Sequence, residues 1–436
     1  MDPSPFAARR TRLLQTMQRG IAVVPTSPER VRNRDAHFPY RFDSYFYYLT
    51  GFCEPDAVLV LVAGDEPRSI LFCRDKDPER ETWDGFRYGP LAAREAFGFD
   101  AAFAIDVYDT HFPDLLGDQP TLYYSLGLDS AWDSRIIAGL NRVRAMGRTG
   151  IRAPAAIVDV NVLVDEMRLF KDEHEITTLR AAADISAAAH HRAMRAARPG
   201  GSENEVEAAL LHEFRRRGAQ APAYTPIVAG GANACILHYI SNDRPLRDGD
   251  LLLIDAACEL DGYAADITRT FPVNGRFSPS QRDAYEIVLT AQAAAMAAVR
   301  PGRPWDAPHE AAVKVLTQGM IDLGLLSGSV DGAMESGAYK RFYMHRTGHW
   351  LGLDVHDAGE YKVDKAWRPL QPGMTLTVEP GLYIRPTEGV PASLWNIGIR
   401  IEDDVLVTAD GCDVLTAAAR KQIEEIEDWM AGHGTD

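Results

Sequence analysis

The second half of the chain repeats itself, and both copies end in an acidic residue. AMRAARPG at residues 193–200 returns as AMAAVRPG at 295–302. LRDGDLLLID at 246–255 then matches LQPGMTLTVE at 370–379, with the leucine, the glycine and the terminal carboxylate at the same spacing. Chance similarity of alanine-rich helices could explain the first pair, but it explains the second much less well. We therefore predict a duplicated unit of two helices and a strand hairpin in an α+β layer arrangement, in which the two acids converge.

The first 168 residues have a different texture. Runs such as AVLVLV at 57–62 and SILFC at 69–73 are typical of strands, and glycine, proline and aspartate separate them from helical stretches. A long alanine-rich helix is expected over 171–197, ended by Arg-Pro-Gly. A length of 436 residues favours two or three domains. We predict a smaller N-terminal α/β domain at 1–168 and a larger domain at 169–436.

Charge and cysteine content exclude several classes of protein. Acids outnumber bases by 62 to 46, for a formal charge of −16, which argues against nucleic-acid or anionic-membrane partners. No apolar run approaches the ~20 residues that span a bilayer, and no signal-peptide pattern is seen. The five cysteines are scattered, without a CxxC pair, so they indicate reduced thiols and a cytoplasmic location.

Two aspartates lie on the expected hairpin after the first repeat. LLLIDAA and YAADITRTF read as a strand and its return, carrying Asp255 and Asp266. A loop of residues 260–261 would place them opposite each other, and a loop of 261–262 diagonally. Either way they share a face. Pairing with Arg269 or a neighbouring base is the simple alternative to a cation bound between them.

More acids and three histidines join this pair. Glu379 ends the strand at 375–379, and IGIRIEDDV alternates so that Arg400 and Glu402 share a face, where an Arg–Glu pair is the simple alternative. His345, His349 and His356 lie within twelve residues, on an expected loop and strand, and do not form the helical HExxH zinc motif. His238, near the end of a short apolar run, is a weaker candidate.

In these motifs the chain resembles the pita-bread metallopeptidases, and most closely their proline-specific branch, Xaa-Pro aminopeptidase (aminopeptidase P). The motifs that carry the resemblance are LLLIDA, ADITRTF, HRTGHWLGLDVHD, TVEPGLYI and GIRIEDD, together with PYRFDSYFYYLTGFCEPDAVLVLV and RETWDGFRYGP in the first part. The resemblance implies a pita-bread catalytic domain with a pseudo-twofold duplication, preceded by a creatinase-like α/β domain that serves oligomerisation and substrate access. The family's five ligands run Asp, Asp, His, Glu, Glu, and the positions that fit are Asp255, Asp266, His349, Glu379 and Glu402.

The resemblance also implies two divalent metals, commonly manganese, with cobalt or zinc as alternatives. Four carboxylates and one imidazole form a hard, oxygen-rich site that suits manganese. By the family pattern Asp266 and Glu402 bridge both metals, Asp255 chelates one, and His349 and Glu379 bind the other.

The implied reaction is attack by a metal-bridging hydroxide on the Xaa-Pro carbonyl, which releases the N-terminal residue of a peptide with proline second. Glu379 would shuttle the proton to the leaving nitrogen. The resemblance gives the remaining roles to His238, His345 and His356 on the substrate side, and to Arg400 and Tyr383 behind the ligands.

Two alternatives stay open at this point. A prolidase would use the same metals on Xaa-Pro dipeptides, and a metal-free pita-bread relative would be a binding protein or a creatinase-like enzyme. The expected partners are peptides with N-terminal Xaa-Pro and other copies of this chain, in a dimer or tetramer. Trp83, in RETWDGFRY, is our candidate to wall a neighbour's active site, although packing within its own domain is an equal alternative.

Overall fold

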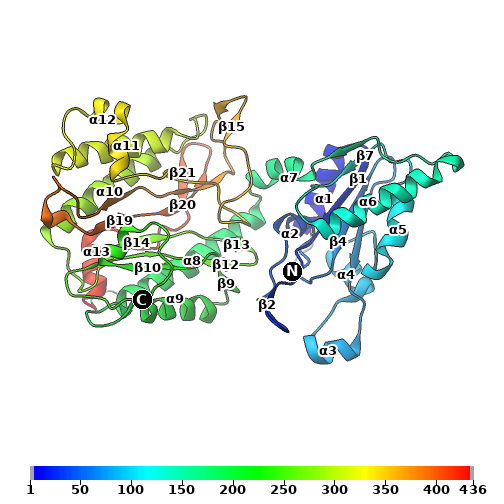
Figure 1. The fold of residues 1–436 in the computed structure, drawn as a ribbon, viewed down its shortest axis with the longest axis horizontal. Helices are drawn as coiled ribbons and strands as arrows, with labels where there is room; N and C mark the ends of the chain where they lie inside the picture. The colour runs from blue at the N-terminus through cyan, green and yellow to red at the C-terminus, as the bar shows by residue number, and fades with distance from the viewer. Residues whose placement is uncertain (1–3, 433–436) are drawn as a thin grey trace. The chain divides into compact units, whose positions relative to one another are not determined.

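The computed structural model describes residues 4–432 of the chain, which divides into two compact units at residues 168 and 169. Each unit is built around its own sheets and helices. Among the described residues, no helix combines the length and apolarity needed to cross a bilayer. Figure 1 shows the chain as a ribbon coloured from blue at the N-terminus to red at the C-terminus.

The first unit contains one six-stranded mixed sheet in the order β6-β5-β4-β1-β7-β8. β4 pairs antiparallel with β1 and β5, whereas β6, β7 and β8 are added in parallel. Its strands are β1 (Gly20–Pro25), β4 (Val58–Ala63), β5 (Arg68–Cys73), β6 (Ala101–Ala104), β7 (Thr121–Tyr123) and β8 (Ala156–Val158). The two runs predicted as strands are thus β4 and β5.

Helices cover both faces of this sheet. α5 and α6 pack against the face that carries Ile21 and Val23, while α1 and α2 contact β4 on the other face. The sheet is therefore buried on both sides, which explains the nearly continuous apolar run of β4. The remaining elements are α1 (Ser4–Met17), β2 (Val31–Asn33), β3 (Ala36–His37), α2 (Ser44–Thr50), α3 (Pro78–Asp84), α4 (Gly89–Phe97), α5 (Tyr108–Leu116), α6 (Ser130–Ala145) and α7 (Val160–Leu169).

The second unit is an α+β arrangement built from two similar halves. The first half comprises α8 (Glu173–Ala196), α9 (Glu203–Arg216), β9 (Ala221–Pro222), β10 (Ile227–Gly230), β11 (Leu251–Asp255), β12 (Cys258–Leu260), β13 (Tyr263–Ala264) and β14 (Thr268–Pro272). The second half comprises α10 (Pro279–Ala298), α11 (Ala307–Asp322), α12 (Val330–Ser336), β15 (Lys362–Val363), β16 (Ala366–Trp367), β17 (Thr375–Val378), β18 (Gly381–Ile384), β19 (Ile397–Arg400), β20 (Asp403–Val407) and β21 (Cys412–Val414), followed by α13 (Ile423–Met430). In Figure 1 the pairs α8–α9 and α10–α11 flank the strands of this unit.

Matching hydrogen bonds join the two repeated motifs in each half. The N–H of Gly200 donates to the carbonyl of Leu246 at 2.9 Å, and the N–H of Gly302 donates to the carbonyl of Leu370 at 2.8 Å. Both leucines are buried. The glycine after each first helix therefore holds the start of each carboxylate-bearing strand, as a duplicated unit requires.

Equivalent side chains also hold the ends of these strands. His190 and Gln292 each lie three residues before the first alanine of the two AM motifs. Nε2 of His190 donates to the carbonyl of Ala256 at 2.8 Å, and Nε2 of Gln292 donates to the carbonyl of Val378 at 3.3 Å. One half thus uses an imidazole where the other uses an amide.

The hairpin after β11 has the register given by a loop of residues 261–262. Leu260 pairs with Tyr263 and Asp255 pairs with Thr268, so Asp266 is the diagonal neighbour of Asp255. Asp261 has a φ of 48°, as expected in a tight two-residue turn closed by glycine.

The strand expected over 397–405 is broken at Ile401 and Glu402. β19 pairs with β18, while β20 joins β17 and β21 in another sheet. The break lets the chain pass from one sheet to the other at the position of Glu402. Because this backbone is bent, the side chain of Glu402 need not follow the simple alternation that the sequence predicts.

The buried imidazole of His190 should make stability depend on pH. Burial lowers the pKa of His190 from 6.5 to about 3, so the folded protein keeps it neutral while the unfolded chain binds a proton below about pH 6.5. The neutral His190 therefore contributes fully to the free energy of unfolding above about pH 6.5. As the pH falls from 6.5 towards 3, this contribution decreases by about 1.4 kcal/mol per pH unit. His190→Gln replaces this histidine by glutamine, the residue at the equivalent position of the other half. Between pH 7 and pH 5, we expect the free energy of unfolding of this variant to decrease by about 2 kcal/mol less than that of the unmodified chain.

Urea unfolding of both proteins at the two pH values measures this difference. Equal pH dependence would contradict the assignment of His190 as a neutral buried group.

Candidate metal centre

The five residues that fit the family's ligand order come together at one cavity of the second unit. This cavity measures about 1070 Å³. Its lining includes Asp255, Asp266, His349, Glu379 and Glu402. The acids stand at or next to strand ends: Asp255 ends β11, Glu379 follows β17, and Glu402 lies between β19 and β20.

Three of these side chains form the tightest group. Ligand atoms of Asp266, His349 and Glu402 all lie within 4.8 Å of one another. Nε2 of His349 is 3.4 Å from Oδ2 of Asp266 and 4.0 Å from Oε1 of Glu379. The structure therefore brings both halves of the duplication to one point.

The loop that carries His349 runs alongside the end of β17. The N–H of Thr377 donates to the carbonyl of His349 at 3.0 Å, and that of Glu379 donates to the carbonyl of Thr347 at 2.8 Å. A Cβ added to Gly348 would lie only 2.1 Å from the carbonyl oxygen of Thr377. Glycine is therefore required here for the loop to approach closely enough to place His349 beside Glu379. The segment 345–356 is otherwise a loop with one bridge, and the strand expected within it does not form.

The imidazole of His349 is held with one nitrogen turned towards the acids. Its Nδ1 lies 2.9 Å from the carbonyl of Trp350, which can only accept, so Nδ1 carries a proton. Nε2 faces the carboxylates. A backbone carbonyl that fixes the tautomer in this way is the usual partner of a metal-binding histidine.

Tyr224 lies between the two aspartates of the hairpin. Its hydroxyl oxygen is 2.6 Å from Oδ1 of Asp255 and 2.6 Å from Oδ1 of Asp266. One hydroxyl carries a single proton and can donate to only one of them. Contacts this short to both acids need a further proton or a cation at this place.

The electrostatics of the cluster show the same need for positive charge. Burial raises the pKa of Glu379 to about 7 and that of Glu402 well above its usual range, and the neighbouring carboxylates add to both shifts. Burial alone would lower the pKa of His349, but its hydrogen bond with Asp266 and the charges of Asp266 and Glu379 raise it to about 9. Protons on these groups thus supply the positive charge that ions of charge +2 would otherwise supply.

The donor set therefore fits divalent cations. Four carboxylates and a neutral imidazole nitrogen are hard ligands that suit ions such as manganese, and no cysteine is among the described residues that line the cavity. Asp266, His349 and Glu402 are close enough to share one ion, with Glu379 beside His349 and Asp255 beside Asp266.

A chain of hydrogen bonds leads away from Asp255. Nη2 of Arg400 donates to Oδ2 of Asp255 at 2.6 Å, and Nη1 donates to the hydroxyl of Tyr383 at 3.0 Å. That hydroxyl is 2.8 Å from Nε2 of His345, whose Nδ1 is 2.7 Å from the carbonyl of Arg346. Because Nδ1 must donate to this carbonyl, Nε2 accepts the proton of Tyr383. Burial lowers the pKa of His345 to about 3, so it is neutral at pH 7.

Histidines and aromatic residues complete the walls of the cavity. His238 reaches it from the loop after β10, and the ring of His356 lies 4.2 Å from that of His349. Tyr383 lies behind His345 and is not part of the lining. The apolar and aromatic lining residues are Tyr224, Ile227, Leu237, Ile240, Trp305, Val355, Tyr361 and Trp367.

Three residues of this centre were not selected from the sequence. They are Tyr224, Thr268 and Asp404. The hydroxyl of Thr268 donates to Oε2 of Glu402 at 2.6 Å, and the N–H of Asp266 donates to Oδ2 of the buried Asp404 at 3.0 Å. The run of three acids in IEDDV and the position of Thr268 two residues after Asp266 were available signals. No local pattern marked Tyr224.

Neither of the two named ion pairs forms, although a base other than Arg269 does pair with one of the hairpin aspartates. Arg269 pairs with Asp403 at 2.6 Å instead of the hairpin aspartates, and its Nη1 also donates to the carbonyl of Glu402 at 2.5 Å. Arg400 pairs with Asp255 and not with Glu402. The two arginines thus bind different parts of the centre, one in the cavity wall and one beneath it.

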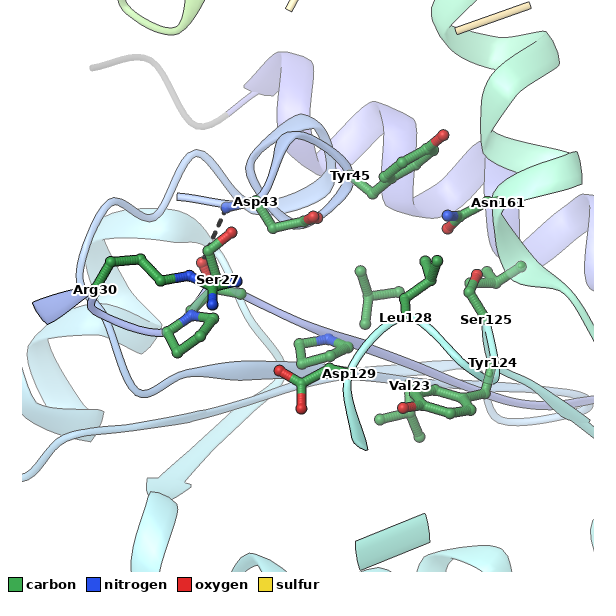
Figure 2. A pocket seen from close by; sticks show the side chains of 15 residues that line it. Val23, Ser27, Arg30, Asp43, Tyr45, Tyr124, Ser125, Leu128, Asp129 and Asn161 are labelled. Carbon is green, nitrogen blue, oxygen red and sulfur yellow. Dashed lines mark hydrogen bonds between the residues drawn. The ribbon is translucent and has the colours of Figure 1, made fainter. Parts of the chain in front are cut away.

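A second, smaller pocket lies in the first unit at the carboxyl ends of β1 and β7. Figure 2 shows it, with Tyr45, Leu128 and Asn161 among its lining, and its volume is about 150 Å³. Its acids are engaged in the fold: Asp43 accepts from the N–H of Phe46 at the start of α2, and Asp129 caps α6. Capping accounts for both carboxylates, so this pocket does not have the character of the metal centre.

Comparisons with known proteins match both units. Residues 177–409 match metallopeptidase family M24, and residues 6–123 match the aminopeptidase P N-terminal domain. The Xaa-Pro aminopeptidase of Escherichia coli (strain K12) is 45% identical over 428 residues, which is 98% of this chain and 97% of the relative.

Solved structures give the same result. Aminopeptidase PepP of Pseudomonas aeruginosa superposes with a TM-score of 0.98 at 50% identity, over 99% of each chain. Zn-substituted Escherichia coli aminopeptidase P in complex with product has a TM-score of 0.97 at 44% identity, over 100% of each chain. The predicted fold class, a duplicated α+β domain preceded by a smaller α/β domain, is confirmed.

Removing one acid should remove bound metal. We expect Asp255→Asn to lose metal at one position and Glu402→Gln at both, because an amide brings no negative charge to the cluster. The loss in affinity should exceed the roughly 10–100-fold cost of losing an outer partner of a ligand. Metal analysis after dialysis measures it, with the exposed Asp322→Asn as control. A variant that keeps the full metal content and full activity would show that its carboxylate is not a ligand.

Proposed function

Because this chain belongs to metallopeptidase family M24 and carries the aminopeptidase P N-terminal domain, we propose that it is an Xaa-Pro aminopeptidase. It removes the N-terminal residue from peptides that have proline in the second position. The observation that carries this function is the group of four acids and one histidine in a large, largely apolar cavity, within a chain 45% identical to such an enzyme over nearly its whole length. The enzyme is a hydrolase that depends on divalent metal.

We infer two divalent ions, manganese above cobalt or zinc, held by Asp255, Asp266, His349, Glu379 and Glu402. The hard donor set supports manganese. When bound, such a pair supplies an activated water and polarises the scissile carbonyl. Asp266 and Glu402, which belong with His349 to the tightest group of ligand atoms, would contact the ions from both halves of the unit.

The chain's own residues handle the proton and the charge of the reaction. Glu379 can take a proton on a carboxylate oxygen and return it to the proline nitrogen. His345 lies 3.5 Å from Glu379 and is neutral. Arg400 and Tyr383 orient it and Asp255, so they act as positioning residues.

The cavity suits a leaving group that offers no N–H. The proline nitrogen is a tertiary amide, so recognition depends on shape. Its apolar and aromatic walls supply that shape, while His238, His345 and His356 can bond to the peptide carbonyls. A prolidase would have to bind the free carboxylate of a dipeptide, and the relatives reported above are named aminopeptidases. The metal-free alternative is disfavoured because all five ligand positions are filled and meet.

Peptide length separates the two proline-specific activities. We expect kcat/KM for Ala-Pro-Ala to exceed that for Ala-Pro by at least about tenfold, equivalent to about 1.4 kcal/mol of transition-state stabilisation. The assay is run with manganese, cobalt and zinc in turn on the metal-depleted protein. Faster cleavage of the dipeptide would assign the chain to the prolidases instead.

We also propose that the chain forms a dimer or tetramer in the cytoplasm. The free thiols of its five cysteines suit that compartment. The first unit serves assembly and access to substrate. Its helix α3 has no buried residue and presents Trp83 at 81% exposure, and Phe86, just after the end of this helix, is 65% exposed. Large aromatic side chains exposed in this way are typical of contact surfaces.

Trp83 is therefore expected to wall the active site of a neighbouring subunit. Trp83→Ala should raise KM about 2–10-fold, the value of one aromatic contact, and leave the melting temperature unchanged because the side chain is exposed. Steady-state kinetics and thermal unfolding measure the two effects. Leu91→Ala, equally truncating an exposed apolar side chain of this unit, is the control. Unchanged kinetics would remove Trp83 from the site.

A further inference from the structure

Two positively charged side chains share one aromatic ring in the wall of the cavity. The guanidinium of Arg346 lies 5.0 Å from the ring centre of Trp367, and Nζ of Lys362 lies 4.1 Å from it. All three residues line the cavity, and both cations are exposed. The ring thus fixes two charges on one stretch of the wall.

The fold holds this group in place. Lys362 and Trp367 face each other across the hairpin of β15 and β16. At the base of the hairpin, the ring of Tyr361 stacks on the buried Trp350, with ring centres 5.5 Å apart. Arg346 directly follows His345, so its backbone is held beside the metal centre. Lys362 is thus placed by the hairpin, and Arg346 by the loop that carries His349.

These charges are not neutralised within the second unit. The acidic residues in the cavity lining are the four of the metal centre, whose charge the ions offset. Neither Arg346 nor Lys362 has an ion pair in the part of this unit that the structure describes. The acids nearest in sequence, Glu360 and Asp364, are exposed and do not line the cavity. This part of the wall therefore carries a net positive charge.

We propose that Arg346 and Lys362 select peptides that carry a carboxylate on the residue after proline. The inference rests on the proposed function. The α-amino group of the substrate is positive and is repelled from this wall, so the wall faces the part of the peptide beyond proline. An acidic side chain and a C-terminal carboxylate offer the same chemistry, and the two cations on Trp367 can bind either one.

Matched peptides distinguish the two sources. Ala-Pro-Glu-amide against Ala-Pro-Gln-amide isolates the side-chain carboxylate, and Ala-Pro-Gln against Ala-Pro-Gln-amide isolates the terminal one. In at least one of the two comparisons, we expect kcat/KM to be about 2–10-fold higher for the peptide that carries the additional carboxylate. This ratio corresponds to the energy of two exposed ion pairs. The preference should shrink in 0.5 M salt, where the Debye length is only about 4 Å.

Substitutions of Arg346 and Lys362 test whether these two side chains cause the preference for a carboxylate. R346Q/K362Q should bring the preference close to 1, and R346K/K362R, which keeps both charges, should retain it. Lys365→Gln, in the same hairpin but outside the lining, is the control and should change nothing.

No preference in either comparison, or a preference that survives in R346Q/K362Q, would overturn the inference while leaving the aminopeptidase activity intact. If none of these peptides were cleaved, both the proposed function and the inference that rests on it would be overturned.

Discussion

Like charges buried together are the constraint on which this molecule depends. Asp255, Asp266, Glu379 and Glu402 meet in the wall of one cavity, where Asp266 and Glu402 are buried, and carboxylates so placed repel one another and lose hydration. The chain itself compensates only in part, through Arg400 and a His349 whose pKa is raised to about 9. The rest must come from protons or from ions. The feature that makes the site costly to fold is therefore the one that makes it bind divalent metal.

The duplication explains how one chain can assemble such a site. Each half ends a buried strand in an acid and holds the start of that strand with the same glycine-to-leucine hydrogen bond, from Gly200 in one half and Gly302 in the other. Contacts between the halves then close the centre, as Thr268 donates to Glu402 and Arg400 donates to Asp255. The five proposed ligand positions are divided between the halves, with Asp255 and Asp266 in the first and His349, Glu379 and Glu402 in the second.

Around the centre, the residues proposed to serve the reaction differ from those proposed to recognise the peptide. The buried line from Arg400 through Tyr383 to His345 keeps a neutral imidazole beside Glu379, the residue proposed to carry the proton. The apolar and aromatic walls suit the proline ring of the proposed substrate, which offers no N–H. The exposed pair on Trp367 comes from two segments, with Lys362 on the hairpin of β15 and β16 and Arg346 on the loop that carries His349. This division is consistent with rigid elements carrying the reaction and surface elements tuning its substrates.

Local sequence determined the repeat, the long helix α8, the acids at the strand ends and the shared face of Asp255 and Asp266. These features follow from the periodicity of apolar residues and from spacings within short segments, which a single sequence contains. The tertiary structure alone decided which arginine pairs with which acid, the interruption of the strand at Ile401 and Glu402, and the positions of Tyr224 and Asp404 at the centre. Those contacts join segments far apart in the chain, and their energies depend on burial and on the full set of neighbouring charges. No local pattern encodes these conditions.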